Sequence, residues 1–192
     1  MRGSQFARDG EEVLISSSSF LFIHIPKTGG TSIESALGGL GHVKRGRKGR
    51  HITAYGARGT KRFDDVFKFC FVRNPYDRLV SWFLHSGCCD FAKFVMDLDL
   101  TKDGSKPQVD YVFHDGECLL DFVGRFERID ADFKHVLERL NIKDVVLPRL
   151  NSRRHQSDRD WRQFYTEELF EVVSWYYRQD IEAFGYDISF RK

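Results

Sequence analysis

The chain has 192 residues, of which 41% are hydrophobic and 30% are charged, and its formal net charge is +2. This composition excludes a disordered tail and a membrane-embedded protein, and a chain of this length can bury a core without disulfides or metals. The small net charge conceals an asymmetry. Residues 35–63 hold eight basic and no acidic side chains, whereas the other 163 residues hold 22 basic and 28 acidic ones. One basic segment on an acidic body predicts an anionic ligand bound at one place and argues against a nucleic-acid-binding surface.

The ends and the cysteines bear on domain organisation and compartment. Residues 1–19 are expected to form a flexible lead-in and residues 20–192 one domain. No apolar run reaches the ~18 residues that a membrane-spanning helix needs. No CxxC pair occurs, so no metal site is expected. The adjacent Cys88 and Cys89 are expected to be reduced thiols, which favours a reducing, cytoplasmic compartment. The start, Met1-Arg2-Gly3-Ser4, resembles a vector-derived leader, which leaves a Golgi or other membrane compartment open if an N-terminal anchor was removed.

The first half of the chain predicts two strand–helix units. Residues 20–25 form a continuous apolar run typical of a buried parallel strand, and a glycine-containing turn and a helix over 31–37 follow. A second apolar strand is predicted over 66–72. It leads directly into a helix with Asn74 as its N-cap and Pro75 as its first residue.

The remaining segments complete the predicted fold. The basic segment 41–62 contains five glycines and is expected to be loop with one short helix. Two short strands around a tight turn are predicted within 111–123, and an amphipathic helix over 130–140. Apolar residues from 169 to 184 suit one long C-terminal helix that ends at Gly185. This order predicts an α/β fold with a P-loop-like parallel central sheet flanked by helices.

The strongest motif is the segment His24-Ile-Pro-Lys-Thr-Gly-Gly-Thr-Ser32, in which a strand feeds a glycine turn that opens a helix. Such a turn directs backbone N–H groups and a positive helix end at one anion. Gly29 and Gly30 allow close approach of the backbone, and Lys27 adds a point charge. Hydroxyl donors follow from Thr28, Thr31 and Ser32. The segment is not a Walker A loop, because its lysine precedes both glycines.

A second motif, Phe69-Cys-Phe-Val-Arg-Asn-Pro-Tyr-Asp-Arg-Leu-Val-Ser81, has the same strand-to-helix form. The carboxyl ends of parallel strands lie on one sheet edge, where α/β folds bind ligands. Arg73 can make a forked contact to a phosphate, and Ser81 lies about two helical turns further on. Arg78 is a weaker candidate for the same anion, and it is expected instead to form a surface ion pair with Asp77 or another neighbour. Two anion sites on one edge predict a ligand with two separated phosphate-like groups.

Together these motifs resemble the nucleotide-dependent sulfotransferases, and most closely the branch that contains heparan sulfate 2-O-sulfotransferase and related carbohydrate sulfotransferases. Further likeness occurs over residues 121–127, 147–152 and 177–186. The resemblance implies the sulfotransferase fold, 3′-phosphoadenylyl sulfate (PAPS) as donor, adenosine 3′,5′-bisphosphate (PAP) as product, and no required metal. The chain is short for an elaborate glycan groove, which argues against a long polysaccharide acceptor.

The resemblance also implies roles for individual residues. The first motif would bind the 5′-phosphosulfate through Lys27, Thr28, Gly29, Gly30, Thr31 and Ser32. Arg73 and Ser81 would bind the 3′-phosphate, and Lys27 would also act in catalysis. A late loop that contains Asn151, Ser152 and Arg153 would contact the adenosine bisphosphate part.

An acceptor hydroxyl needs a general base, and histidine titrates in the right range. His51 is the favoured base, because related glycan sulfotransferases place their base histidine in the segment between the two motifs. His24 is the second choice and is more readily explained by a structural hydrogen bond, and His42 is the third. Glu34 is a further alternative, and its simpler interpretation is a solvated carboxylate near a helix N-terminus.

The predicted function is transfer of the PAPS sulfuryl group to a hydroxyl of a carbohydrate or small-molecule acceptor, with no nucleic-acid partner. Two alternatives stay open: a P-loop nucleotide kinase-like enzyme, and a non-catalytic module that binds polyanions through residues 42–62. The sequence specifies neither the acceptor nor the oligomeric state.

Overall fold

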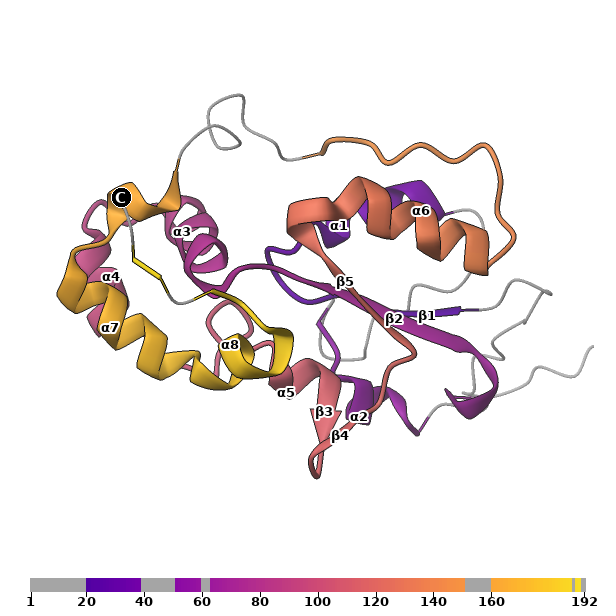
Figure 1. The fold of residues 1–192 in the computed structure, drawn as a ribbon, viewed down its shortest axis with the longest axis horizontal. Coiled ribbons are helices and arrows are strands. Elements are labelled where there is room, and N and C mark those ends of the chain that lie inside the picture. The colour runs from indigo at the N-terminus through magenta and orange to yellow at the C-terminus, as the bar shows by residue number, and fades with distance from the viewer. Residues whose placement is uncertain (1–19, 39–50, 60–62, 151–159, 188, 191–192) are drawn as a thin grey trace, which may run out of the picture.

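A parallel three-stranded sheet forms the centre of the computed structural model (Figure 1). Its strands are β1 (Phe20–Ile23), β2 (Phe67–Val72) and β5 (Phe122–Arg125), in the order β1-β2-β5, so that β2 is central. Both pairings are parallel, with Phe22 opposite Phe69 and Phe71 opposite Gly124. The predicted α/β fold with a parallel central sheet is thereby confirmed. The structure describes residues 20–38, 51–59, 63–150, 160–187 and 189–190.

One face of the sheet is covered by α1 (Gly30–Leu37) and α6 (Ile129–Arg139). Successive strand residues point to opposite faces, so the phenylalanines at alternate positions of β1 and β2 meet on this side. They pack against Ile33 and Leu37 of α1 and against Phe133 and Val136 of α6. The predicted amphipathic helix over 130–140 thus exists, shifted by one residue, and its apolar side closes this face.

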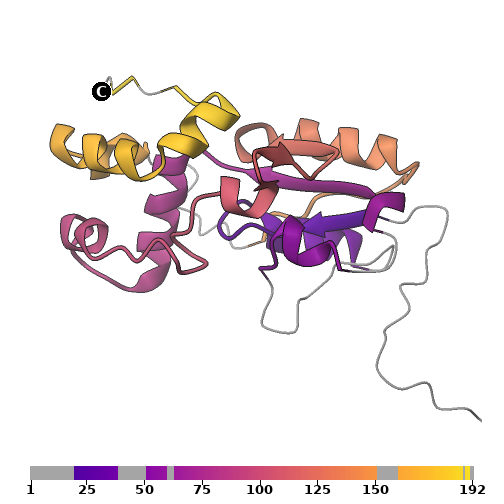
Figure 2. The same cartoon turned by 90° about the horizontal axis from the view of Figure 1, so that it is seen from below.

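The opposite face carries the intervening non-aromatic apolar residues, including Ile23 and Cys70. Two short helices cover it, α2 (Ala54–Ala57) and α5 (Val109–Val112). Seen from below, α5 lies between the sheet and a group of helices beside it (Figure 2). Val109 and Val112 of α5 pack on the sheet, and α5 also contacts the helix over Arg178–Phe184, so it links the sheet to these helices.

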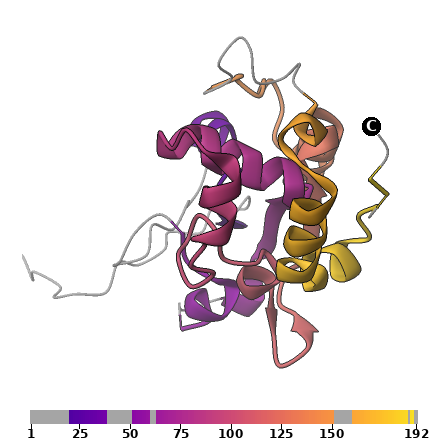
Figure 3. The same ribbon diagram turned by 90° about the vertical axis from the view of Figure 1, so that its left-hand side faces the viewer.

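The helices beside the sheet form a lobe of their own, which we call the helical lobe. It contains α3 (Pro75–Ser86), α4 (Phe91–Met96), α7 (Glu167–Tyr176) and α8 (Arg178–Phe184). Figure 3 shows that α3 and α4 lie alongside α7 and α8. Aromatic rings fill the interior, where Tyr76 stacks on Phe170 at a centroid distance of 4.4 Å and on Trp161 at 5.1 Å. Asn74 caps α3 and Pro75 begins it, as predicted.

Several boundaries differ from the sequence predictions. The first strand ends at Ile23, so His24 and Ile25 already belong to the turn. The long C-terminal helix is two helices interrupted at Tyr177, although Gly185 ends the second one in a left-handed conformation as predicted. Within the described ranges, short 3₁₀ helices connect the elements at Phe63–Asp65, Phe126–Arg128 and Trp161–Phe164.

The two short strands around a tight turn that were predicted within 111–123 are present, with narrower bounds. Tyr111 and Val112 are helical, and the hairpin consists of β3 (Phe113–His114) and β4 (Glu117–Cys118). Asp115 and Gly116 between them both have positive φ, as a two-residue hairpin turn requires. The segment after the hairpin crosses back to the central sheet and supplies β5. None of the helices in the described parts of the chain has the length and apolar character to cross a membrane.

Candidate anion-binding active site

The turn after β1, residues 24–29, has the backbone shape of an anion site. Lys27 and Gly29 have positive φ angles of 69° and 85°. The amides of Ser32 and Ile33 bond to the carbonyl of Gly29, which starts α1. The N–H groups from Thr28 to Thr31 make no hydrogen bond of ordinary geometry to any residue that the structure describes. Alternating left-handed residues before a helix N-terminus form a concave array of donors suited to a phosphate or sulfate group.

Both glycines of the turn are required by close neighbours. A Cβ atom on Gly30 would lie 2.2 Å from the His24 ring, and one on Gly29 would lie 2.7 Å from Cδ1 of Ile129. Such distances leave no room for a side chain without displacing these groups. The glycines therefore serve the packing of His24 and of α6 as well as the backbone shape.

The hydroxyl groups of the turn are partly used within the protein. Thr28 is fully buried, and its Oγ1 donates to the carbonyl of Ile25 at 2.9 Å. Ser32 Oγ accepts from the amide of Leu150 at 3.1 Å, whereas Thr31 is half-buried with no protein partner in the described residues. Thr28 thus offers its amide to an anion while its hydroxyl closes the turn. The bond from Leu150 brings the chain that precedes residue 151 to the first turn of α1.

Arg73, at the end of β2, reaches across to the first motif. Its Nη1 donates to the carbonyl of Lys27 at 3.2 Å, and its Nε pairs with Asp77 at 2.8 Å. The guanidinium also lies over the Phe126 ring, 4.1 Å from its centroid. The second terminal nitrogen, Nη2, has no acceptor among the described residues. The two motifs therefore meet at one edge of the sheet, with one guanidinium nitrogen available for a ligand there.

Arg78 does not form the predicted surface ion pair with Asp77, which pairs with Arg73 instead. Its side chain is buried, and it donates to the carbonyls of Pro26 and Lys106 at 3.0 Å and of Gly104 at 3.4 Å. The apolar pattern of α3 places this residue on the polar side of the helix. The prediction fails because α3 is enclosed on that side too, by loops whose carbonyl groups need donors.

Ser81 lies on α3, half-buried, and its hydroxyl bonds to no residue in the described ranges. Asn151, Ser152, Arg153 and His42 lie outside the described residues, as do most of the basic side chains of residues 41–62. The roles of these residues in donor binding and as the third-choice base therefore stay predictions.

Three candidate proton-transfer groups meet beside the turn. His24 Nδ1 lies 2.8 Å from Oε1 of Glu34, and both side chains are buried. His51 Nδ1 lies 3.0 Å from the carbonyl oxygen of His24, and the two imidazoles meet edge to face at 4.8 Å. Glu34 is therefore not the solvated carboxylate that was expected. The reason is that α1 turns this residue inward, toward the histidine that follows β1.

The contact of His51 fixes its tautomer. A carbonyl oxygen can only accept, so Nδ1 of His51 carries the proton and the lone pair of the neutral ring lies on Nε2. His51 is only partly buried, so this nitrogen belongs to a side chain that ligands can approach. The arrangement is the one that a general base needs.

Gln108 bonds to Arg73, and Asp180 bonds to Gln108; neither residue was among the candidates. Gln108 is fully buried and bonds to the backbone of Arg73 through both ends of its amide. Asp180 is also fully buried, and burial raises the pKa of its carboxyl group, against the opposing effects of the Arg78 charge and of bonds from Gln108 and Val109. Gln108 lies in a segment without a motif. Asp180 lies in the segment 177–186 that resembles the sulfotransferases, but its position in that segment gives no indication of its role.

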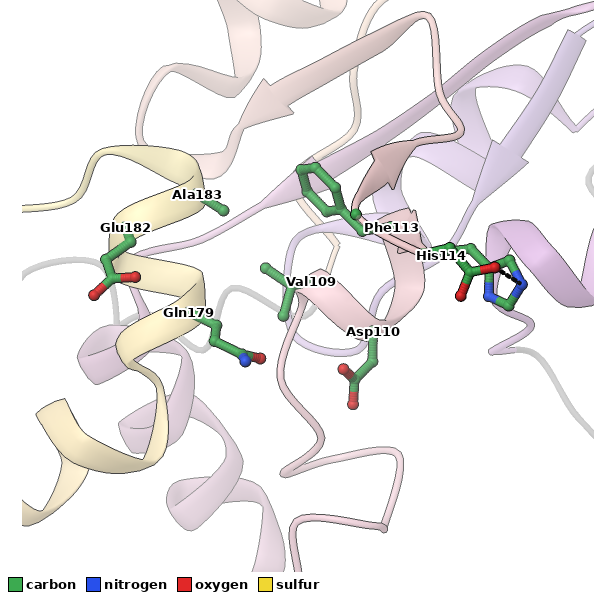
Figure 4. Close-up of a pocket in the computed structure, with 9 residues that line it drawn as sticks. Val109, Asp110, Phe113, His114, Gln179, Glu182 and Ala183 are labelled. Carbon is green, nitrogen blue, oxygen red and sulfur yellow. Dashed lines mark ion pairs between the residues drawn. The ribbon is translucent and has the colours of Figure 1, made fainter.

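A shallow pocket of about 570 Å³ lies elsewhere, between α5, the β3–β4 hairpin and α8 (Figure 4). Its lining combines apolar side chains such as Val109 and Phe113 with the carboxylates of Asp110 and Glu182. None of the predicted site residues lines it. Across the described ranges, no group of three or more His, Cys, Asp or Glu residues is arranged to hold a metal ion.

Comparisons with known proteins agree with this geometry. The model of the sulfotransferase family matches residues 13–187. A protein from Archaeoglobus fulgidus, named only as an uncharacterized protein, is 27% identical over 100 residues, which cover 49% of this chain and 83% of that relative. On the strength of the match along nearly its whole length, this chain belongs to the sulfotransferase family.

Proposed function

We propose that this protein transfers the sulfuryl group of PAPS to a hydroxyl of a carbohydrate or small-molecule acceptor. Family membership gives the reaction class. The observation that carries the more specific proposal is the contact of Arg73 Nη1 with the carbonyl of Lys27, which joins the two proposed anion-binding strand ends at one sheet edge. A donor with phosphate groups at both its 5′ and 3′ ends matches two such sites.

The residues of the site fit this donor. The amides of Thr28 to Thr31 would hold the 5′-phosphosulfate, since they make no regular bond within the described protein. Arg73 Nη2 and the Ser81 hydroxyl would hold the 3′-phosphate, and Asn151, Ser152 and Arg153 are proposed to contact the remainder. The donor supplies a sulfuryl group that is activated by its phosphate leaving group.

Lys27 is proposed to stabilise the negative charge that develops on the leaving phosphate and on the transferred group. Sulfuryl transfer resembles phosphoryl transfer in needing alignment and charge stabilisation more than covalent chemistry. The left-handed backbone at Lys27 is an uncommon conformation for a residue with a side chain. Such strain is often retained at functional sites, which supports a role for this turn in binding.

His51 is the proposed general base, and its Nε2 would accept the proton of the acceptor hydroxyl. His24 is less suited, because Glu34 takes its Nδ1 and its ring packs against the backbone of Gly30. We assign to the His24–Glu34 pair the task of holding the carbonyl that orients His51. Because His51 Nδ1 donates to this carbonyl, the ring proton of His51 stays on Nδ1 and the lone pair stays on Nε2, where a base needs it.

The kinase alternative is disfavoured by the charges around the sheet edge. The residue after β2 and the last residue of β5 are both arginines, Arg73 and Arg125. A site for ATP with magnesium would place a carboxylate on a strand next to the phosphate loop. A bisphosphate ligand without a metal suits the arginines better.

A transfer assay with labelled PAPS tests the proposal. Glycosaminoglycan fragments, simple sugars and hydroxylated small molecules would serve as acceptors, with binding of PAP measured on the same preparation. Label transferred by the wild type and not by Lys27→Ala supports the proposal. Absence of both transfer and PAP binding would overturn it, and phosphoryl transfer from ATP would establish the kinase alternative instead.

A further inference from the structure

We infer that Gln108 and Asp180 form a buried clamp that positions Arg73 to receive the 3′-phosphate of the donor. The clamp consists of these two side chains. The inference rests on the proposed function, because it concerns the 3′-phosphate half of the same site. It assigns a positioning role to two residues that do not themselves contact the ligand.

The first part of the clamp is the amide of Gln108. Its Oε1 accepts from the backbone N–H of Arg73 at 2.9 Å, and its Nε2 donates to the backbone carbonyl of Arg73 at 2.9 Å. This two-bond pairing imitates a neighbouring strand residue and extends the ladder one position beyond Val72, the last residue of β2. The backbone of Arg73 is thus held where the chain leaves the sheet for α3.

The second part is the carboxylate of Asp180, on α8. Its Oδ2 accepts from the backbone N–H of Gln108 at 2.9 Å and from Nε2 of Gln108 at 3.2 Å, while Oδ1 accepts from the backbone N–H of Val109 at 2.9 Å. An acceptor-only group beside Nε2 fixes which end of the amide is the donor. Asp180 therefore sets the orientation that lets Gln108 pair with both backbone groups of Arg73.

With the clamp in place, contacts within the protein use most of the atoms of Arg73 that could bind a ligand. The backbone is fixed by Gln108, the Nε by Asp77, the Nη1 by the carbonyl of Lys27, and one face of the group by Phe126. Only Nη2 lacks a partner in the part of the chain that the structure describes. A side chain restrained in this way loses little further freedom on binding a phosphate, which increases affinity.

The two residues also tie the site to the helical lobe. Asp180 is 72 residues from Gln108 in the chain, and α8 contacts α5 directly. Burial of an unpaired carboxylate is costly, so the hydrogen bonds and the nearby charge of Arg78 are needed to keep it there. The position of Arg73 thus depends on how α5 and α8 pack together.

The test compares two ligands that differ only in the 3′-phosphate: PAP and adenosine 5′-monophosphate. The dissociation constant of adenosine 5′-monophosphate divided by that of PAP, both measured by calorimetry on the intact chain, reports the contribution of the 3′-phosphate subsite. We expect Gln108→Leu and Asp180→Asn each to reduce this ratio by about tenfold or more, as expected for a lost bond to a charged group. Asp180→Asn keeps the shape of the side chain, so it remains informative if Gln108→Leu folds poorly.

Controls separate a positioning role from a general structural one. Gln179→Leu, at an exposed neighbour on α8, should leave the ratio unchanged. Arg73→Ala should reduce the ratio as much as the clamp variants do, and Asp180→Asn added to it should have no further effect. Equal weakening of both ligands would show that the clamp is merely structural and would overturn the inference.

The outcomes also distinguish this inference from the proposed function. If the wild type binds both nucleotides equally, no 3′-phosphate subsite exists and the proposed donor is wrong. If the wild type prefers PAP and both clamp variants retain that preference, the inference alone is wrong.

Discussion

Nη1 of Arg73 donates to the carbonyl oxygen of Lys27 at 3.2 Å, so the end of β2 is bonded to the turn that follows β1. The two residues are 46 positions apart in the chain. Their contact means that a ligand bound through the amides of the turn lies next to the guanidinium of the neighbouring strand. Binding and chemistry at this edge are therefore expected to respond together to changes in either motif.

Replacement of His51 tests the assignment of the general base. His51→Ala should lower kcat by about 10²- to 10⁴-fold, because the acceptor hydroxyl loses its proton acceptor. The dissociation constant of PAP should change little, since the proposed donor contacts come from other residues. His85→Ala, at an exposed histidine of α3, is the matched control and should retain activity. Lost PAP affinity together with normal turnover at saturation would show that His51 has another role.

Gly30→Ala tests the close packing of the turn. The new methyl group would lie 2.2 Å from the His24 ring, so His24 or α1 must move. We expect a loss of about 1–3 kcal/mol in the free energy of unfolding, the usual effect of overpacking, and weaker binding of PAP. Gly59→Ala is the control, because a Cβ atom there meets nothing within 4 Å. Urea denaturation of both variants measures the difference, and equal stability would contradict the described packing.

Arg78→Met tests the buried arginine of α3. The substitution leaves carbonyl groups of Pro26 and Lys106 without their donor, and each such buried group costs about 1–3 kcal/mol. The free energy of unfolding should therefore fall by at least about 2 kcal/mol. Arg178→Met removes an exposed arginine of α8 and should change stability by no more than about 0.5 kcal/mol. Similar effects of the two variants would mean that Arg78 is not buried in solution.

The sequence predicts the sheet edge well, because its signals there are local. Strand runs, the glycine pair, the Asn74 cap and Pro75 all depend on neighbours within a few positions, and the structure confirms these elements. The burial of the Arg78 and Glu34 side chains depends instead on which segments pack against their helices. Gln108 and Asp180 are 72 residues apart, so only the folded chain reveals that they meet.

The C-terminal region shows a second limit. Apolar spacing over 169–184 continues across Tyr177, so periodicity alone gives one helix where the chain forms α7 and α8. Tyr177 is buried and donates to the carbonyl of Ser105 at 2.6 Å, a contact from a distant loop. The change in helix direction places Asp180 toward Gln108, which no local pattern encodes.

Cys70 makes stability depend on pH. Its thiol is fully buried in the sheet, and burial raises its pKa well above the ordinary value of 9.0. As the pH rises through about 9, the unfolded chain releases this proton while the folded protein keeps it, so the unfolded state binds fewer protons and stability falls. Relative to Cys70→Val, the wild type should lose up to about 1.4 kcal/mol per pH unit above that value.

Denaturation of both proteins between pH 7 and pH 10 measures this slope. The three other cysteines are exposed and serve as an internal comparison: in the folded protein they should react quickly with a thiol reagent, whereas Cys70 should react only on unfolding. Parallel stability curves, or rapid modification of Cys70 in the folded protein, would contradict its burial.

Calorimetric titration with PAP, compared with ATP and magnesium, tests most directly the claim that this sheet edge binds a nucleotide with phosphates at both ends. Binding of PAP without metal, lost in Lys27→Ala and weakened in Arg73→Ala, is the predicted result. Tight binding of ATP with magnesium and no binding of PAP would contradict the account.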